Sequence, residues 1–167
     1  DIHNVRYLSG FTGSAGFLFI TKNNQIFVTD FRYQEQAKTE VKGFNIKIQA
    51  VEKTEFIKKL AEKYNIRKLV FEEQNINYYT YKKLRKNSLK LKALTDTIED
   101  LRVIKSQQEL FFIKTAVRRA ENAFKKLQPF IKVGVTEQKL AMRLEGLLRE
   151  EGCKNLPFGV IVTSGHM

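Results

Sequence analysis

Two short apolar runs near the amino terminus have the spacing of a β-hairpin. They cover residues 17–20 and 26–29, and Asn23 and Asn24 lie between them. Asparagine is favoured in tight turns because it tolerates backbone angles that other residues resist. The pattern therefore predicts two adjacent strands that turn at these two asparagines.

From residue 30 onward, apolar positions with helical spacing alternate with further strand-like runs. Asp30 can cap a helix that carries Tyr33, Ala37 and Val41 on one side, and Gly43 stands where such a helix would stop. A second helix is expected from about residue 54 and a third through residues 81–84, with strands at residues 44–50, 68–72 and 89–94. Strands interleaved with helices predict an α/β domain in which one largely shared, mixed sheet carries flanking helices.

The pattern changes after residue 95. Residues 96–105 show no clear period and are interpreted as a linker. Ser106 and Glu109 then form a capping-box pattern, in which each side chain accepts a hydrogen bond from the other residue's backbone amide. An apolar stripe follows and Pro129 ends the helix; the stripe consists of Leu110, Ile113, Val117, Ala120, Phe124 and Leu127.

A second helix and a strand are expected to complete the visible part of this region. Thr136 can cap the helix and Gly152 can end it. Its inward positions are Leu140, Leu144, Leu147 and Leu148. Residues 158–162 are apolar and β-branched, which predicts a buried strand leading into a Ser164–Gly165 turn. Two helices and one strand make an incomplete α+β domain, so we place domains at residues 1–102 and 103–167.

Composition restricts the class of protein. The chain has 167 residues, 43% of them hydrophobic, and a single cysteine. One cysteine cannot form a disulfide within the chain, which favours a reducing, cytoplasmic setting. No apolar run approaches the roughly 20 residues of a membrane helix, and no signal peptide is recognisable. A membrane role is therefore not expected.

The formal charge of +12 raises the question of nucleic-acid binding. The densest basic stretch consists of Lys82, Lys83, Arg85, Lys86, Lys90 and Lys92, close to Tyr78, Tyr79 and Tyr81. Such a mixture could bind nucleic acid, because the basic side chains pair with phosphate charges and the tyrosines stack on bases. We favour the alternative, a solvated helix whose tyrosines and leucine face the core, because exposed lysine-rich faces are common.

Candidate catalytic groups are sparse. The histidines are His3 and His166, and no spacing typical of a metal site occurs, so no metal site is expected within this chain. His166 is interpreted as an exposed turn residue. Ser14 and Ser164 lie near glycines but in no nucleophile elbow, and we interpret both as turn serines. Glu72 and Glu73 would point to opposite sides of a strand end, which argues against a paired acid and base.

The loop at residues 9–16 contains Gly10, Gly13 and Gly16 without a phosphate-loop spacing. The three glycines allow backbone shapes that other residues resist. We expect them to hold Phe11 and Thr12 outward at a loop tip.

Four motifs in order resemble one known family. They are NVRYLSGFTGSAG at residues 4–16, VTDFRYQEQA at 28–37, IEDLRVIKSQQELFFIKTAVRRAENAF at 98–124 and LPFGVIVTSG at 156–165. Together they span nearly the whole chain and are similar to the aminopeptidase P and prolidase group, the "pita-bread" metallopeptidases that cleave Xaa-Pro bonds. Creatinase is a relative of the same group.

The resemblance implies a fold and a chemistry. The first domain would be creatinase-like, lacking here its first helix and strand, and the second would be the beginning of the pita-bread domain. The family's metal ligands and its substrate histidine lie beyond the matched residues, so no catalytic residue is assigned to this chain. The complete protein would use two divalent ions, manganese, cobalt or zinc, and hydrolyse proline-containing peptides.

The resemblance also implies roles for the first domain. In family dimers it packs against the partner subunit, and its glycine-bearing loop reaches toward the neighbour's active site. We therefore assign Phe11, Thr12 and Ser14 to substrate access in trans, and Phe31, Arg32 and Tyr33 to a domain or subunit contact. For Phe11 and Tyr33, simple core packing is an equal alternative.

Two other functions remain open from the sequence. One is a non-catalytic binding or assembly module of the same fold. The other is a creatinase-like enzyme that is not a peptidase, because the residues that separate those activities lie beyond Met167.

Overall fold

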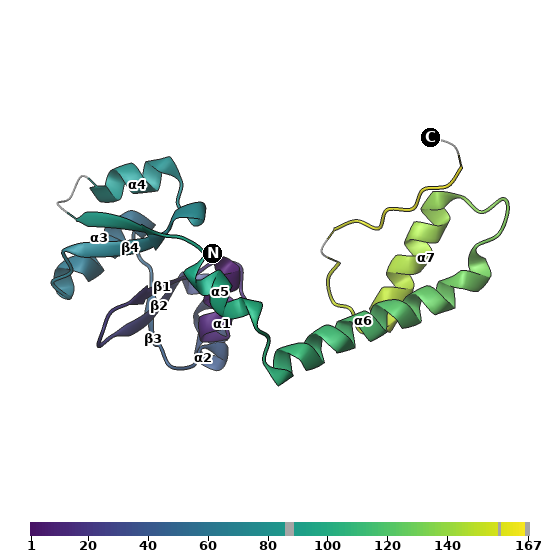
Figure 1. The fold of residues 1–167 in the computed structure, drawn as a ribbon, viewed down its shortest axis with the longest axis horizontal. Coiled ribbons are helices and arrows are strands. Elements are labelled where there is room, and N and C mark those ends of the chain that lie inside the picture. Colours follow the sequence, from purple (N-terminus) through teal and green to yellow (C-terminus); the bar gives the residue numbers. More distant parts are fainter. Residues whose placement is uncertain (86–88, 157, 166–167) are drawn as a thin grey trace. The chain divides into compact units, whose positions relative to one another are not determined.

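The computed structural model describes residues 1–85, 89–156 and 158–165. The chain divides into two compact units, Asp1–Ile104 and Lys105–Met167 (Figure 1). Each unit is described by itself.

The strands of the first unit form two sheets. The hairpin is confirmed: β1 (Phe17–Ile20) pairs antiparallel with β2 (Gln25–Thr29), and Phe17 lies opposite Val28. β2 also pairs in parallel with β3 (Asn45–Ile48). The second sheet is a parallel pair of β4 (Lys68–Glu72) and β5 (Lys90–Leu94). The mixed α/β class is therefore confirmed, although the strands divide over two sheets.

The expectation of one shared sheet is wrong at the junction of β1 and β4. Among the described strands these two share no hydrogen-bond ladder. Cavities of about 430 and 330 Å³ lie beside both strands and are lined by Leu18 and Phe19 of β1 and by Leu69 and Val70 of β4. β1 and β4 thus belong to separate sheets.

Five α-helices belong to the first unit. They are α1 (Ile2–Ser9), α2 (Gln34–Glu40), α3 (Lys53–Lys63), α4 (Tyr78–Arg85) and α5 (Thr97–Val103). Short 3-10 turns, Phe31–Tyr33 and Glu73–Asn75, follow β2 and β4. The sequence pattern did not predict α1 or α5.

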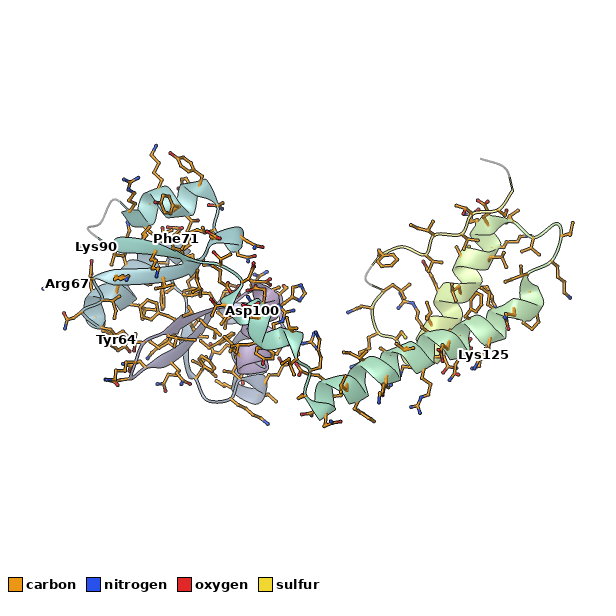
Figure 2. All side chains as sticks on the ribbon, in the orientation of Figure 1. Tyr64, Arg67, Phe71, Lys90, Asp100 and Lys125 are labelled. Carbon is orange, nitrogen blue, oxygen red and sulfur yellow. The ribbon has the colours of Figure 1, made fainter. Side chains whose placement is uncertain are left out.

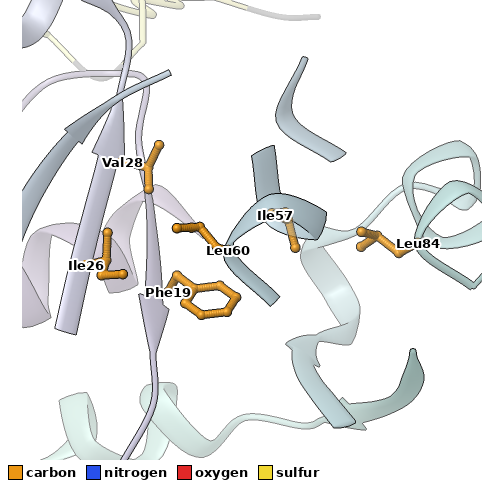
Figure 3. Close-up of a cluster of buried hydrophobic side chains, with 6 residues drawn as sticks. All are labelled: Phe19, Ile26, Val28, Ile57, Leu60 and Leu84. Atoms are coloured by element: carbon orange, nitrogen blue, oxygen red, sulfur yellow. The ribbon is translucent and has the colours of Figure 1, made fainter. Parts of the chain in front are cut away.

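Two apolar clusters hold the first unit together. Figure 3 shows one of them, in which α3 contributes Ile57 and Leu60 against Phe19, Ile26 and Val28 of the hairpin. Leu84 of α4 completes this cluster. The second cluster consists of Val5, Phe11, Phe27 and Ala37, and it lies where α1, α2 and the glycine-bearing loop meet β2. Helix burial against both sheets thus stabilises the unit.

The second unit consists of two helices and their connections. α6 (Gln107–Leu127) begins with the predicted capping box, in which the Ser106 hydroxyl accepts from the Glu109 amide and the Glu109 carboxylate accepts from the Ser106 amide. A 3-10 turn, Gln128–Phe130, follows, and α7 (Glu137–Glu150) is capped by Thr136 as predicted.

Burial between α6 and α7 is confined to one end of α6. Ala123 and Leu127 pack on Leu147, and the expected inward residues Leu140, Leu144 and Leu148 surround them. The predicted stripe of α6 is exposed upstream at Ile113 and Val117, and also at Phe124, between the two buried residues. The helix was predicted correctly, but most of its apolar side has no cover among the described residues.

The strand predicted at residues 158–162 is wrong. These residues form no strand, and the side chains of Phe158 and Ile161 are 73% and 82% exposed. A strand needs a neighbouring edge for its backbone hydrogen bonds. The described part of the second unit offers no other strand, so an apolar sequence alone cannot form one.

Candidate functional site

The glycine-bearing loop, defined here as residues 10–16, connects α1 to β1. Gly10 ends α1 in the left-handed conformation, with φ 81°, and its amide donates to the Arg6 carbonyl at 2.8 Å. Glycine adopts this conformation without the steric cost that a side chain would add. The loop therefore leaves the helix in a defined direction.

Phe11 does not lie at a loop tip, so that expectation is wrong. Its side chain is 0% exposed and packs on Phe27 and Tyr33, with ring centroids 4.7 and 5.6 Å away. The contact with Tyr33 is edge to face, a favoured aromatic geometry. Burial of this ring outweighs any tendency of the glycines to expose it, so Phe11 anchors the loop to the core.

Gly13 is required by this packing. A Cβ atom at this position would lie 2.3 Å from the Phe11 ring and 2.9 Å from the Tyr33 ring. Neither distance is compatible with van der Waals contact. The glycine thus allows the backbone to cross directly over the buried aromatic pair.

Thr12 is exposed and held by α2. Its amide donates to Glu40 Oε2 at 2.7 Å, and its hydroxyl donates to Glu40 Oε1 at 2.8 Å. Gln36 Nε2 donates to both the Thr12 hydroxyl and Glu40 Oε1, each at 3.0 Å. Partial burial favours the neutral acid, yet the hydrogen bonds from Thr12 and Gln36 together hold the pKa of Glu40 below its ordinary value.

Ser14 and Tyr33 form the other side of the loop. The Ser14 hydroxyl and the Tyr33 hydroxyl are 2.6 Å apart and share a hydrogen bond. Ser14 is exposed, and Tyr33 is half-buried because its ring packs on Phe11. Of the three residues assigned to substrate access, Thr12 and Ser14 are therefore the ones that face solvent.

The segment after β2 presents Phe31 and Arg32. Phe31 is 77% exposed, which is unusual for a phenylalanine. Arg32 forms two hydrogen bonds with Asp30, from Nε at 3.0 Å and from Nη2 at 2.8 Å. The hydrogen bonds from Arg32 lower the pKa of Asp30. The guanidinium also lies 5.5 Å from the Tyr33 ring centroid, so this segment is ordered next to the loop.

The remaining predicted candidates form no paired catalytic groups with one another in the described residues. Glu72 and Glu73 point to different partners, Asn4 and Thr95, which excludes a paired acid and base. In the second unit, Ser164 donates to Glu137 Oε1 from its amide at 2.6 Å and from its hydroxyl at 3.1 Å. His3 is exposed on α1, and His166 lies outside the described residues.

The basic stretch differs from its predicted arrangement. Leu84 of α4 is buried as expected, but Tyr78 and Tyr79 are exposed rather than turned to the core. The ammonium group of Lys83 lies 4.5 Å from the Tyr79 ring centroid, so this tyrosine covers a neighbouring lysine. Figure 2 shows Lys90 at the beginning of β5; Lys86 lies outside the described residues.

The described side chains do not fit a metal centre. Within residues 1–85, 89–156 and 158–165, no three His, Cys, Asp or Glu side chains come together to hold an ion. A pair of divalent ions requires several carboxylate or imidazole ligands in one place. No metal-dependent step is therefore assigned to this part of the molecule.

The described residues include no helix with the length and hydropathy that crossing a lipid bilayer demands.

Comparison with known proteins matches the two units to two domain families. Residues 1–104 match the Creatinase/Prolidase N-terminal domain, and residues 112–167 match Metallopeptidase family M24. An uncharacterized peptidase, YqhT, of Bacillus subtilis is 37% identical over 164 residues, covering 97% of this chain and 46% of that protein. An Xaa-Pro dipeptidase of Pyrococcus horikoshii is 30% identical over 167 residues, covering 98% of this chain and 46% of the relative.

Solved structures agree with these matches. An Xaa-Pro dipeptidase from Bacillus anthracis superposes with a TM-score of 0.85 at 33% identity, covering 91% of this chain and 43% of its own. An X-Pro aminopeptidase from Thermotoga maritima superposes with a TM-score of 0.83 at 28% identity, covering 94% of this chain and 45% of its own. The chain thus spans less than half the length of the curated relatives and of the two solved structures named here.

Fold and comparisons together define the class: the first unit is a mixed α/β domain of the creatinase type, and part of the second unit matches Metallopeptidase family M24. The chain belongs to the family defined by the Creatinase/Prolidase N-terminal domain. The resemblance noted in the sequence is thereby confirmed.

Proposed function

We propose that this chain is the amino-terminal part of a metal-dependent Xaa-Pro peptidase that hydrolyses the bond before proline. One observation carries the proposal: nearly the whole chain is similar to proteins named Xaa-Pro dipeptidase, at 30% identity over 98% of the chain in one case and at 33% over 91% in a solved structure. The metal ligands would lie in residues that follow this chain. The fragment itself would be inactive and would reside in the cytoplasm, as its single cysteine suggests.

We further propose that the first unit shapes the access of substrate. The exposed hydroxyls of Thr12 and Ser14 are fixed by Glu40 and Tyr33, which supports a role as a preformed wall. Phe11 supports that wall from beneath, because its ring is buried under Gly13. In this proposal the loop acts toward the active site of a partner subunit.

Phe31 supports a subunit contact in the same proposal. A large exposed aromatic side chain beside an ordered arginine is typical of interface anchors. In a longer form of the protein, replacing Phe31 with Ser should shift sedimentation from dimer toward monomer. A dimer that resists the substitution at low protein concentration would exclude Phe31 from the interface.

The experiment that tests the function compares two lengths of the protein. The 167-residue chain and a form continued through the whole metallopeptidase domain are assayed on an Xaa-Pro dipeptide with manganese or cobalt added. We expect hydrolysis by the longer form alone, abolished by a chelator and restored by the metal. Inactivity of the longer form under all metals would favour the non-catalytic module of the same fold.

A further inference from the structure

A buried amide joins three elements of the first unit. Asn4 of α1 is 2% exposed, which is uncommon for a polar side chain. Its Nδ2 donates to Glu72 Oε1 at the end of β4, at 2.5 Å, and to Glu99 Oε1 of α5, at 2.6 Å. Arg102 Nη1 of α5 donates to its Oδ1 at 2.7 Å. Both donors and the acceptor of the amide are thus used.

We propose that Asn4 is a positioning residue that clasps α5, the last helix of the first unit, to α1 and β4. No residue of α5 is fully buried, and Asp96 at its start provides no side-chain cap. A helix of seven residues is not stable on its own. One further contact, from the Tyr7 hydroxyl to the Leu101 carbonyl at 3.2 Å, joins α1 to α5.

The clasp depends on the donor character of the amide. Glu72 and Glu99 both point at Asn4 Nδ2, and two carboxylates so placed repel each other unless a donor lies between them. The other charged groups here are Arg102 and Lys53 of α3, whose charge interacts with that of Glu72. The hydrogen bond from Asn4, with the charge of Arg102, lowers the pKa of Glu99.

The clasp holds the last helix before the chain leaves the first unit. α5 ends at Val103 and the first unit ends at Ile104, so the chain leaves the unit directly after the clasped helix. Asn4 belongs to the first of the four sequence motifs, and Glu99 and Arg102 belong to the third. The clasp therefore joins, through hydrogen bonds, residues of two motifs that are distant in the sequence. This proposal does not depend on Xaa-Pro hydrolysis and can fail while the proposed function stands.

The substitution Asn4→Asp tests the clasp in the 167-residue chain. It keeps the size of the side chain but replaces the donor with a third carboxylate facing Glu72 and Glu99. Amide hydrogen exchange in α5, which Figure 2 locates by the label Asp100, should accelerate about tenfold at pH 7 relative to the wild type. Three carboxylates in one place raise the pKa of at least one of them, since the Asn4 hydrogen bond that lowered the pKa of Glu99 is lost in the variant. At pH 4.5 the ratio should therefore fall toward one, because a protonated carboxyl can donate again. Asn23→Asp, the same change at an exposed turn, should leave α5 unchanged.

Two further variants decide the outcome. Adding Glu99→Gln to Asn4→Asp should restore part of the protection of α5, since the glutamine amide can donate to the new carboxylate. If Asn4→Asp does not fold at pH 7, Arg102→Met, which removes one bond of the clasp, should accelerate exchange in α5 and leave β2 protected. Unchanged α5 exchange in Arg102→Met, or an equal effect of Asn4→Asp at both pH values, would overturn the proposal.

Discussion

At the scale of single residues, burial decides what the glycine-bearing loop can do. The sequence places Phe11, Thr12 and Ser14 together between glycines, and that grouping suggested three outward side chains. The structure separates them, because Phe11 finds Phe27 and Tyr33 as partners. Those partners come from β2 and from the turn after it, so the local sequence contains no sign of them. The core-packing alternative for Phe11 is confirmed.

Replacing Phe11 with Ala should destabilise the first unit by about 3–5 kcal/mol, because it leaves a cavity under Gly13. Urea unfolding followed by tyrosine fluorescence reports on this unit, since all six tyrosines lie between Tyr7 and Tyr81 and the chain has no tryptophan. Phe31→Ala is the matched control: measured like Phe11→Ala at a protein concentration at which the 167-residue chain is monomeric, it should change stability by less than about 0.5 kcal/mol. Equal effects of the two substitutions would contradict the burial of Phe11.

The carboxylate of Glu40 should make the loop sensitive to acid. The folded-state pKa of Glu40 is lowered, so its stabilising contribution is present above the unfolded-state value of about 4.5 and is lost as the pH falls through the folded-state value. Glu40→Gln removes this dependence. Between pH 6 and pH 3, the urea concentration at the unfolding midpoint should therefore fall more for the wild type than for Glu40→Gln.

The control for this pH effect is Glu35→Gln on the same helix, where the exposed carboxylate pairs with Lys38. It should follow the wild type across the pH range. A wild type and a Glu40→Gln variant with parallel pH profiles would show that Thr12 does not depend on the charge of Glu40.

At the scale of elements, strong local sequence signals were sufficient to predict a helix or a strand. Elements whose stability depends on distant residues were not predicted correctly. The hairpin, the capping box of Ser106 and the inward leucines of α7 follow from turn residues, caps and apolar period, and all are confirmed. α5 was interpreted as a linker because its stability comes from Asn4 and not from an apolar stripe. The strand at residues 158–162 failed for the opposite reason: its composition suits a strand, but no edge is present to pair with it.

Ser106→Ala should loosen the beginning of α6, because the capping box satisfies two amides that the helix leaves without partners. A loss of about 1 kcal/mol corresponds to roughly fivefold faster hydrogen exchange over the first turn. Gln107→Ala, one residue later, is the control and should leave the exchange near its wild-type rate. Fast exchange in both variants, or in neither, would show that the capping box does not hold this end of the helix.

At the scale of the whole molecule, the two units differ in how much of their apolar surface is buried among the described residues. The first unit buries two apolar clusters and offers an ordered loop. The second unit buries one end of α6 and leaves Phe111, Phe112 and Phe124 exposed among the described residues. An apolar surface of this kind requires cover. The relatives are more than twice as long as this chain, which supports the proposal that the remaining metallopeptidase domain supplies that cover.

The most direct test of the central claim is the substrate preference of the protein continued through that domain. With manganese or cobalt present, kcat/KM is measured for an Xaa-Pro dipeptide and for the matched Xaa-Ala dipeptide. The account predicts cleavage of the Xaa-Pro bond with a preference of at least about a hundredfold, the scale of a binding difference near 3 kcal/mol. Equal cleavage of both dipeptides, or cleavage of neither, would contradict it.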